Sequence, residues 1–219
     1  MKYLFLRSAF TICLLFSITC TFAAGNFKPG DKVNVWSLSG LPLKQKPDVK
    51  SKNLLVIPYG KTVSILTVTS NQLEVLFSNY ADPLYELQGE WVNVVYKGKN
   101  GYVFDGFLSA MPPLHLSKQG KTEAIENYLG RNFGQGMVTT NTGKVNGQVS
   151  KITTTLYTNG YKLVETTYGN CSGHQLFLKN ITYPEAMLFE KVYHINANAT
   201  VKIKKKWHHV ILISSHNCG

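Results

Sequence analysis

The residues best suited to chemistry lie in the last 50 positions of the chain. Two cysteines, Cys171 and Cys218, fall in this region. Of the histidines in this region, His174, His208, His209 and His216 are nearest to the cysteines in the sequence. A thiolate beside an imidazole can act as a nucleophile, because the imidazole accepts the thiol proton. The same residue types can bind a transition metal, and two cysteines can join as a disulfide.

The N-terminus indicates which of these chemistries is available. Lys2 and Arg7 precede an uncharged stretch from Ser8 to Ala24, and small residues would allow cleavage near Ala23 or Ala24. This pattern is typical of a secretory signal peptide, and its apolar centre is short for a membrane span. A lipid-modified Cys20 and an uncleaved anchor are the alternatives. We therefore expect residues 1–24 to be a signal peptide and the protein to be periplasmic or secreted.

Export determines the expected state of the cysteines. Cys13 and Cys20 would leave with the signal peptide, so Cys171 and Cys218 remain as one pair. In an oxidising compartment this pair predicts a disulfide, which would close a loop of about 47 residues and stabilise the fold by roughly 3–4 kcal/mol. Adjacent His208 and His209 would point to opposite faces of a strand, so only one of them could join a metal site. The sequence also shows no compact ligand spacing. We expect no metal and no cofactor.

Positive charge is concentrated in the second half of the chain. The whole sequence has a formal net charge of +11, and residues 116–219 hold 12 lysine and arginine residues against five acidic ones. Such a surface could bind anionic lipid headgroups, acidic glycans or cell-wall polymers, or only keep the protein soluble. The sequence contains no aromatic and basic motif typical of nucleic-acid binding, so we expect no nucleic-acid partner.

Short runs of β-type residues separated by turns dominate the first half. Residues 32–36, 63–68, 90–96 and 102–104 read as strands, and Lys97 to Gly101 reads as a hairpin turn. Many short strands of this kind predict a mainly β fold beginning with a small barrel. Its expected core is apolar: Val35, Val63, Ile65, Leu66, Val94, Val103 and Leu108.

Four motifs in this half resemble the bacterial SH3-like domain family, over about 80 residues from position 28 to 110. They are Gly40-Leu41-Pro42-Leu43, Pro58-Tyr59-Gly60-Lys61-Thr62-Val63, Gly89-Glu90-Trp91-Val92-Asn93-Val94 and Gly98-Lys99-Asn100-Gly101-Tyr102-Val103, closed by Phe107-Leu108-Ser109. Tyr102 replaces the usual tryptophan, and residues 71–88 form an insertion. The resemblance implies an SH3-like β-barrel that binds a peptide, peptidoglycan or an envelope protein.

The resemblance also suggests a candidate ligand groove, because aromatic side chains at loop edges give flat apolar platforms. The candidate residues are Tyr59, Tyr80, Tyr85, Trp91, Tyr102 and Phe104, with Asp105 as a polar partner for an amine. An aromatic residue in a small barrel can equally belong to the core.

Paired prolines at 112 and 113 suggest a boundary between a barrel at residues 25–112 and a second unit at 113–219. This unit reads as α+β, with short helices over residues 121–132 and after Thr182, and closing strands at 199–203 and 209–214. Asn159-Gly160 separates two β-branched runs and predicts a hairpin turn. Thr182 and Glu185 have the spacing of a helix capping box. The unit matches no family known to us.

One segment suggests an enzyme. Asn170-Cys171-Ser172-Gly173-His174 resembles the nucleophile motif of NlpC-type cell-wall cysteine peptidases, and residues 208–211 resemble their histidine strand. In that family the cysteine follows an aspartate and opens a helix, whereas here Asn170 precedes it and strand-like runs flank it. The favoured function is therefore an exported, non-catalytic binding protein of the bacterial envelope. A cysteine peptidase using Cys171 and a structural envelope subunit are the alternatives.

Overall fold

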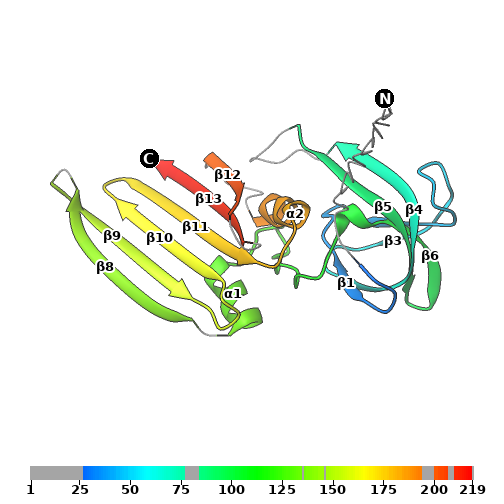
Figure 1. The fold of residues 1–219 in the computed structure, drawn as a ribbon, viewed down its shortest axis with the longest axis horizontal. Helices are drawn as coiled ribbons and strands as arrows, with labels where there is room; N and C mark the ends of the chain where they lie inside the picture. The colour runs from blue at the N-terminus through cyan, green and yellow to red at the C-terminus, as the bar shows by residue number, and fades with distance from the viewer. Residues whose placement is uncertain are drawn as a thin grey trace, which may run out of the picture.

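The structure of the chain is a computed structural model that describes residues 27–76, 84–134, 136–145, 147–193, 200–206 and 210–218. Within these ranges it contains two antiparallel sheets and two α-helices (Figure 1). The expected fold class, mainly β with an α+β part, is confirmed. The expected signal peptide, Tyr80, His208 and His209 lie outside the described residues.

The first sheet has seven strands in the order β3-β2-β6-β5-β4-β1-β7. The strands are β1 (Lys32–Val35), β2 (Leu41–Lys44), β3 (Asn53–Ile57), β4 (Thr62–Leu76), β5 (Glu86–Tyr96), β6 (Lys99–Phe104) and β7 (Leu108–Ser109). Register shifts between β4 and β5 interrupt their long pairing, and such bulges bend a strand. The sheet therefore curves around its own core (Figure 1).

The core of the first sheet follows the alternation of its strands. Val35, Val63, Ile65, Val94, Val103 and Leu108 are buried as predicted. Leu66 is 37% exposed, which contradicts its expected core position. Because neighbouring strand residues point to opposite faces, the burial of Ile65 directs Leu66 outward. Lys97 and Gly98 both have positive φ and form the tight turn between β5 and β6.

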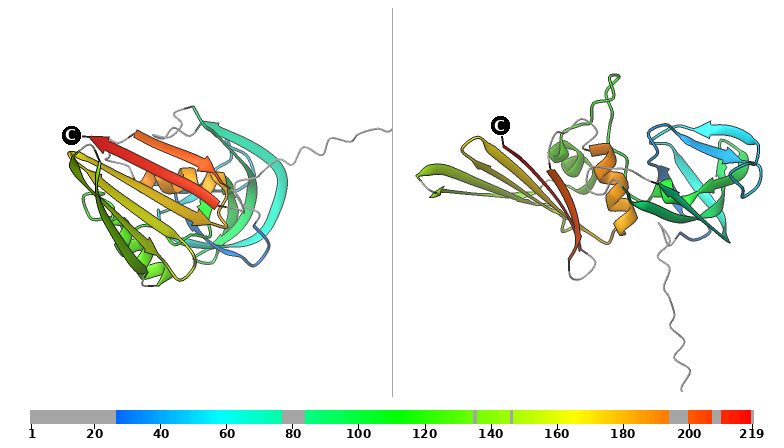
Figure 2. Two further views of the ribbon diagram at one scale, coloured as in Figure 1. Left: turned by 60° about the vertical axis from the view of Figure 1, so that its left-hand side comes forward. Right: turned by 90° about the horizontal axis from the view of Figure 1, so that it is seen from above.

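The second sheet has six strands in the order β12-β13-β11-β10-β9-β8. The strands are β8 (Met137–Val145), β9 (Gln148–Leu156), β10 (Lys162–Tyr168), β11 (Cys171–Lys179), β12 (Thr200–Lys205) and β13 (Val210–Cys218). Helices α1 (Ile125–Phe133) and α2 (Tyr183–Tyr193) lie between this sheet and the first one (Figure 2). The predicted hairpin turn at Asn159-Gly160 joins β9 to β10, while the first helix begins four residues later than expected.

A shared apolar core joins the two sheets. Trp36, Leu87 and Phe104 belong to the same buried cluster as the helix residues Tyr128 and Phe189. The ring centroids of Trp36 and Phe189 are 5.9 Å apart, and the Trp36 indole donates a hydrogen bond to the Met111 carbonyl at 3.2 Å. Buried contacts thus join the residues before and after the predicted boundary at positions 112–113.

Glu185 strengthens this junction with a buried carboxylate. Its Oε2 accepts hydrogen bonds from the amide and the hydroxyl of Thr182, at 2.9 and 3.1 Å, so the predicted capping box is present. Its Oε1 accepts a 2.6 Å hydrogen bond from the hydroxyl of Ser109, the last residue of β7. One side chain therefore both caps α2 and connects it to the first sheet.

We expect Glu185→Gln to lower the free energy of unfolding by about 1–3 kcal/mol, because an amide cannot accept hydrogen bonds on both sides and its NH₂ group would face buried donors. Urea denaturation followed by circular dichroism measures this. Glu74→Gln is the matched control, since Glu74 is exposed and accepts one hydrogen bond from Gln88. Equal stability of the two variants would show that Glu185 does not hold the junction.

Candidate functional site

The candidate groove of the first sheet is not assembled as one exposed surface. Trp91, Phe104 and Asp105 are only 6%, 4% and 1% exposed, so their side chains are not available to a ligand. Packing of the second unit explains the burial of Phe104, which belongs to the shared core. This corrects the expectation that these three residues line a groove.

The other described groove residues contact the protein itself. The half-buried Tyr59 donates a hydrogen bond from its hydroxyl to the Leu114 carbonyl at 3.1 Å. Tyr85 packs edge-on against Tyr183 of α2, with ring centroids 5.7 Å apart. Tyr102 is half-buried opposite Asn93 of β5. These positions lie on separate parts of the structure, and a ligand contact by any of them stays a prediction.

Asp105 has a structural partner instead of a ligand. Its Oδ1 accepts a 2.7 Å hydrogen bond from the amide of Glu90. Burial raises the pKa of the Asp105 carboxyl from 3.8 to about 7, although this amide hydrogen bond opposes the shift. A Cβ at Gly89 would overlap Oδ1 of Asp105, so only glycine at position 89 leaves room for this carboxyl.

We expect the stability of the protein to fall as pH rises from about 4 to 7, because the unfolded chain loses the Asp105 proton before the folded chain does. Asp105→Asn keeps an acceptor for the Glu90 amide but does not titrate. Its unfolding free energy should therefore depend less on pH, with a difference of up to about 4 kcal/mol across this range. Denaturant titrations of both proteins at pH 4, 5.5 and 7 test this. Parallel pH profiles would contradict the raised pKa.

The predicted disulfide is present between Cys171 and Cys218. The two residues are directly opposite each other on β11 and β13, with Cα atoms 4.0 Å apart. Cys171 begins a strand, not a helix, and its sulfur is bonded. The Nε2 atom of His216 lies 3.2 Å from the Cys218 sulfur.

His174 occupies the opposite, helix-covered face of the second sheet. Its Nε2 lies 3.7 Å from Oε1 of Glu165, its neighbour on β10. Burial raises the pKa of the Glu165 carboxyl, and the carboxyl of Glu126 on α1 adds to this effect through its charge and a hydrogen bond. His174 and His216 therefore point to opposite faces of the second sheet.

The two faces of the second sheet differ in what covers them. On one face the inward strand residues pack in the shared core with residues of both helices: Leu163, Leu176, Leu178, Val201, Ile211 and Ile213. On the other face, which we call the open face, no helix among the described residues lies over the strands (Figure 2). The register places one row of residues across all six strands of this face: Met137, Leu156, Lys162, Phe177, Leu212 and Lys204.

A shallow hollow of about 560 Å³ lies along this row. Its apolar lining residues are Leu156, Phe177, Val210 and Leu212. Lys162, Lys179 and Lys206 also line it, and none of its lining residues is acidic. The Lys162 ammonium lies 4.0 Å from the centroid of the Phe177 ring, close enough for a cation–π contact. The arrangement combines positive charge with an apolar surface.

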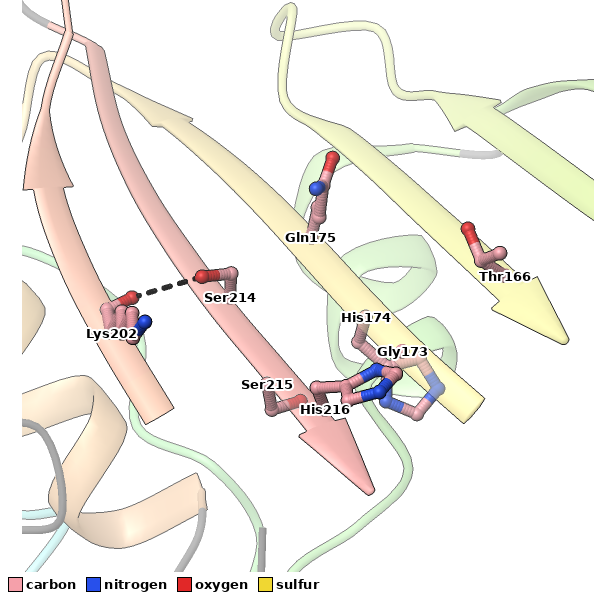
Figure 3. Close-up of a pocket in the computed structure, with 8 residues that line it drawn as sticks. All are labelled: Thr166, Gly173, His174, Gln175, Lys202, Ser214, Ser215 and His216. Atoms are coloured by element: carbon pink, nitrogen blue, oxygen red, sulfur yellow. Dashed lines mark hydrogen bonds between the residues drawn. The ribbon is translucent and has the colours of Figure 1, made fainter. Parts of the chain in front are cut away.

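The turn between β9 and β10 makes room for this hollow. Gly160 has a φ of 81°, and a Cβ there would lie 2.7 Å from the Lys179 ammonium. Glycine therefore allows both the tight turn and the close approach of Lys179. A second hollow, of about 510 Å³, lies next to the first on the open face and includes Thr166, Gln175, Lys202 and His216 (Figure 3).

Sequence reasoning missed the open face, although two signals pointed to it. The excess of positive charge in residues 116–219 was visible, and so was the alternation of lysines with apolar residues at positions 201–204. The pairing of six strands brings these lysines to one face, and local patterns do not reveal that pairing.

None of the described helices is long and apolar enough to cross a membrane. No protein-family model matches the chain, and no curated protein or solved structure is significantly similar to it.

Proposed function

We infer that this chain is an exported, non-catalytic binding protein whose binding surface is the open face of the second sheet. The hollow with three lysines over an apolar floor is the observation that carries this proposal. Because three lysines and no acidic residue line the hollow, its electrostatic potential is positive and attracts a negatively charged partner. The apolar floor favours a partner that also has hydrocarbon to bury.

The ligand that fits these properties best is an acidic peptide segment of another protein, with at least one apolar side chain. Carboxylates of the segment would pair with Lys162, Lys179 and Lys206, while the apolar side chain would contact Phe177 and Leu212. Neighbouring strands are about 4.8 Å apart, so a segment crossing the strands meets apolar positions between the lysines, as at Phe177 and Leu212 between Lys162 and Lys204.

Several features support a binding protein over an enzyme. Cys171, the candidate nucleophile, is half of a disulfide and so presents no thiolate. The resemblance of residues 28–110 to SH3-like domains favours recognition rather than catalysis. We propose that this first unit acts as an SH3-like module. The disulfide and the N-terminal sequence both favour a periplasmic or secreted location, because disulfides persist in oxidising compartments.

The test uses a fluorescein-labelled ten-residue peptide of alternating glutamate and leucine, and fluorescence polarisation measures its affinity. We expect the double variant Lys162→Glu and Lys179→Glu to weaken binding at least tenfold, since two attractive contacts of about 1 kcal/mol each become repulsive. The control double variant Lys50→Glu and Lys52→Glu makes the same charge change on exposed lysines between β2 and β3.

Equal weakening by both double variants would show that only the net charge matters, and would overturn the assignment of the open face. Vesicles of phosphatidylglycerol provide the second comparison. If they bind the protein through the same lysines and the peptide does not, the partner is an anionic membrane and the peptide proposal is wrong.

A further inference from the structure

Three metal-binding side chains meet at one end of the open face. The sulfurs of Cys171 and Cys218 and a ring nitrogen of His216 all lie within 4.8 Å of one another. The closest approach between the imidazole and a sulfur is 3.2 Å, between His216 Nε2 and Cys218 Sγ. Two thiolates and one imidazole are a ligand set that binds Zn²⁺.

We propose that reduction of the Cys171–Cys218 disulfide converts this cluster into a Zn²⁺ site. In the oxidised protein the sulfurs are bonded to each other and are poor ligands. In the reduced protein both are available as thiolates. The redox state of the cysteine pair therefore controls Zn²⁺ binding. The oxidised form does not hold the ion, and the reduced form does. This inference does not depend on the proposed peptide binding.

The chemistry balances with a dithiol as reductant. The dithiol gives two electrons and two protons to the Cys171–Cys218 bond, which yields two thiols, and is itself oxidised to a disulfide. Zn²⁺ then displaces the two thiol protons, and the neutral imidazole of His216 supplies the third ligand. Two thiolates neutralise the charge of the ion, so binding adds no net charge to this basic part of the protein.

Strand pairing keeps the ligands in place when the disulfide is broken. β11 and β13 are paired over nine consecutive residue pairs, from Cys171 opposite Cys218 to Lys179 opposite Val210. These backbone contacts do not require the sulfur–sulfur bond, and sites built on paired strands are more rigid than sites on loops. Reduction therefore has to move side chains only.

Space for the ion also exists around His216. Gly173 is directly opposite His216, and a Cβ at Gly173 would lie 3.4 Å from Nδ1 of the imidazole. Because glycine has no Cβ, this side of the ring is left uncovered. His216 also lines the second hollow of the open face. A fourth ligand, such as water or a group of a bound molecule, can reach the ion from this side. Zinc sites with three protein ligands and an open fourth position are typical of catalytic zinc.

The experiment measures Zn²⁺ binding by competition with the chromophoric chelator 4-(2-pyridylazo)resorcinol. The full chain carries Cys13→Ser and Cys20→Ser, so that Cys171 and Cys218 are its remaining cysteines. One sample is reduced with dithiothreitol and desalted without oxygen, and the other stays oxidised. We expect one Zn²⁺ per reduced chain and at least tenfold weaker binding to the oxidised chain.

His216→Ala should weaken Zn²⁺ binding to the reduced chain at least tenfold. His115→Ala is the matched control, because His115 is exposed and is not among the residues that line the hollow at His216, and it should leave binding unchanged. Bound Zn²⁺ should also slow alkylation of Cys171 and Cys218 by iodoacetamide. Circular dichroism reports whether the reduced chain keeps its sheets.

Three results would overturn the proposal. Equal binding to oxidised and reduced chains would assign the ion to other histidines. Unchanged affinity in His216→Ala would remove the imidazole from the site. Loss of the β-sheet signal on reduction would show that the strands do not hold the ligands without the disulfide.

Discussion

The structure depends on the buried junction in which Glu185 and Trp36 join the two sheets. The Glu185 carboxylate caps α2 and accepts the hydrogen bond from Ser109, so the orientation of the helix is tied to the end of the first sheet. The Trp36 ring packs against Phe189 of the same helix. A buried carboxylate that lost its donors would be unfavourable, which makes these contacts mutually dependent. The junction turns two small β structures into one folded body.

The junction also determines which surfaces are free to bind. The helices cover one face of the second sheet and contact the first sheet with their other side, so Phe104 becomes part of the core. The open face keeps its lysines and apolar side chains at the surface. The surface with the chemistry of a binding site is therefore on the second sheet, and the first sheet packs against the helices behind it.

The register of β11 and β13 determines which reactive side chains lie next to each other. Cys171 and Cys218 are 47 positions apart in the sequence, yet the register of β11 and β13 places them directly opposite each other. The same register places His216 beside Cys218 on one face and His174 on the other. A shift of β13 by one residue would turn His216 to the face that holds His174 and would separate the two cysteines, because side chains alternate between faces.

The sequence alone determined the features that depend on neighbouring residues. The β-rich runs, the Asn159-Gly160 turn and the Thr182–Glu185 cap were predictable because each arises from contacts within a few positions. The cysteine pair was predictable by elimination once export was inferred. Only the tertiary structure decided that Asp105 and Phe104 are buried, and that lysines of three separate strands gather with Lys206 on the two hollows. Alternation along a strand identifies two faces, but the packing of distant elements decides which face is covered.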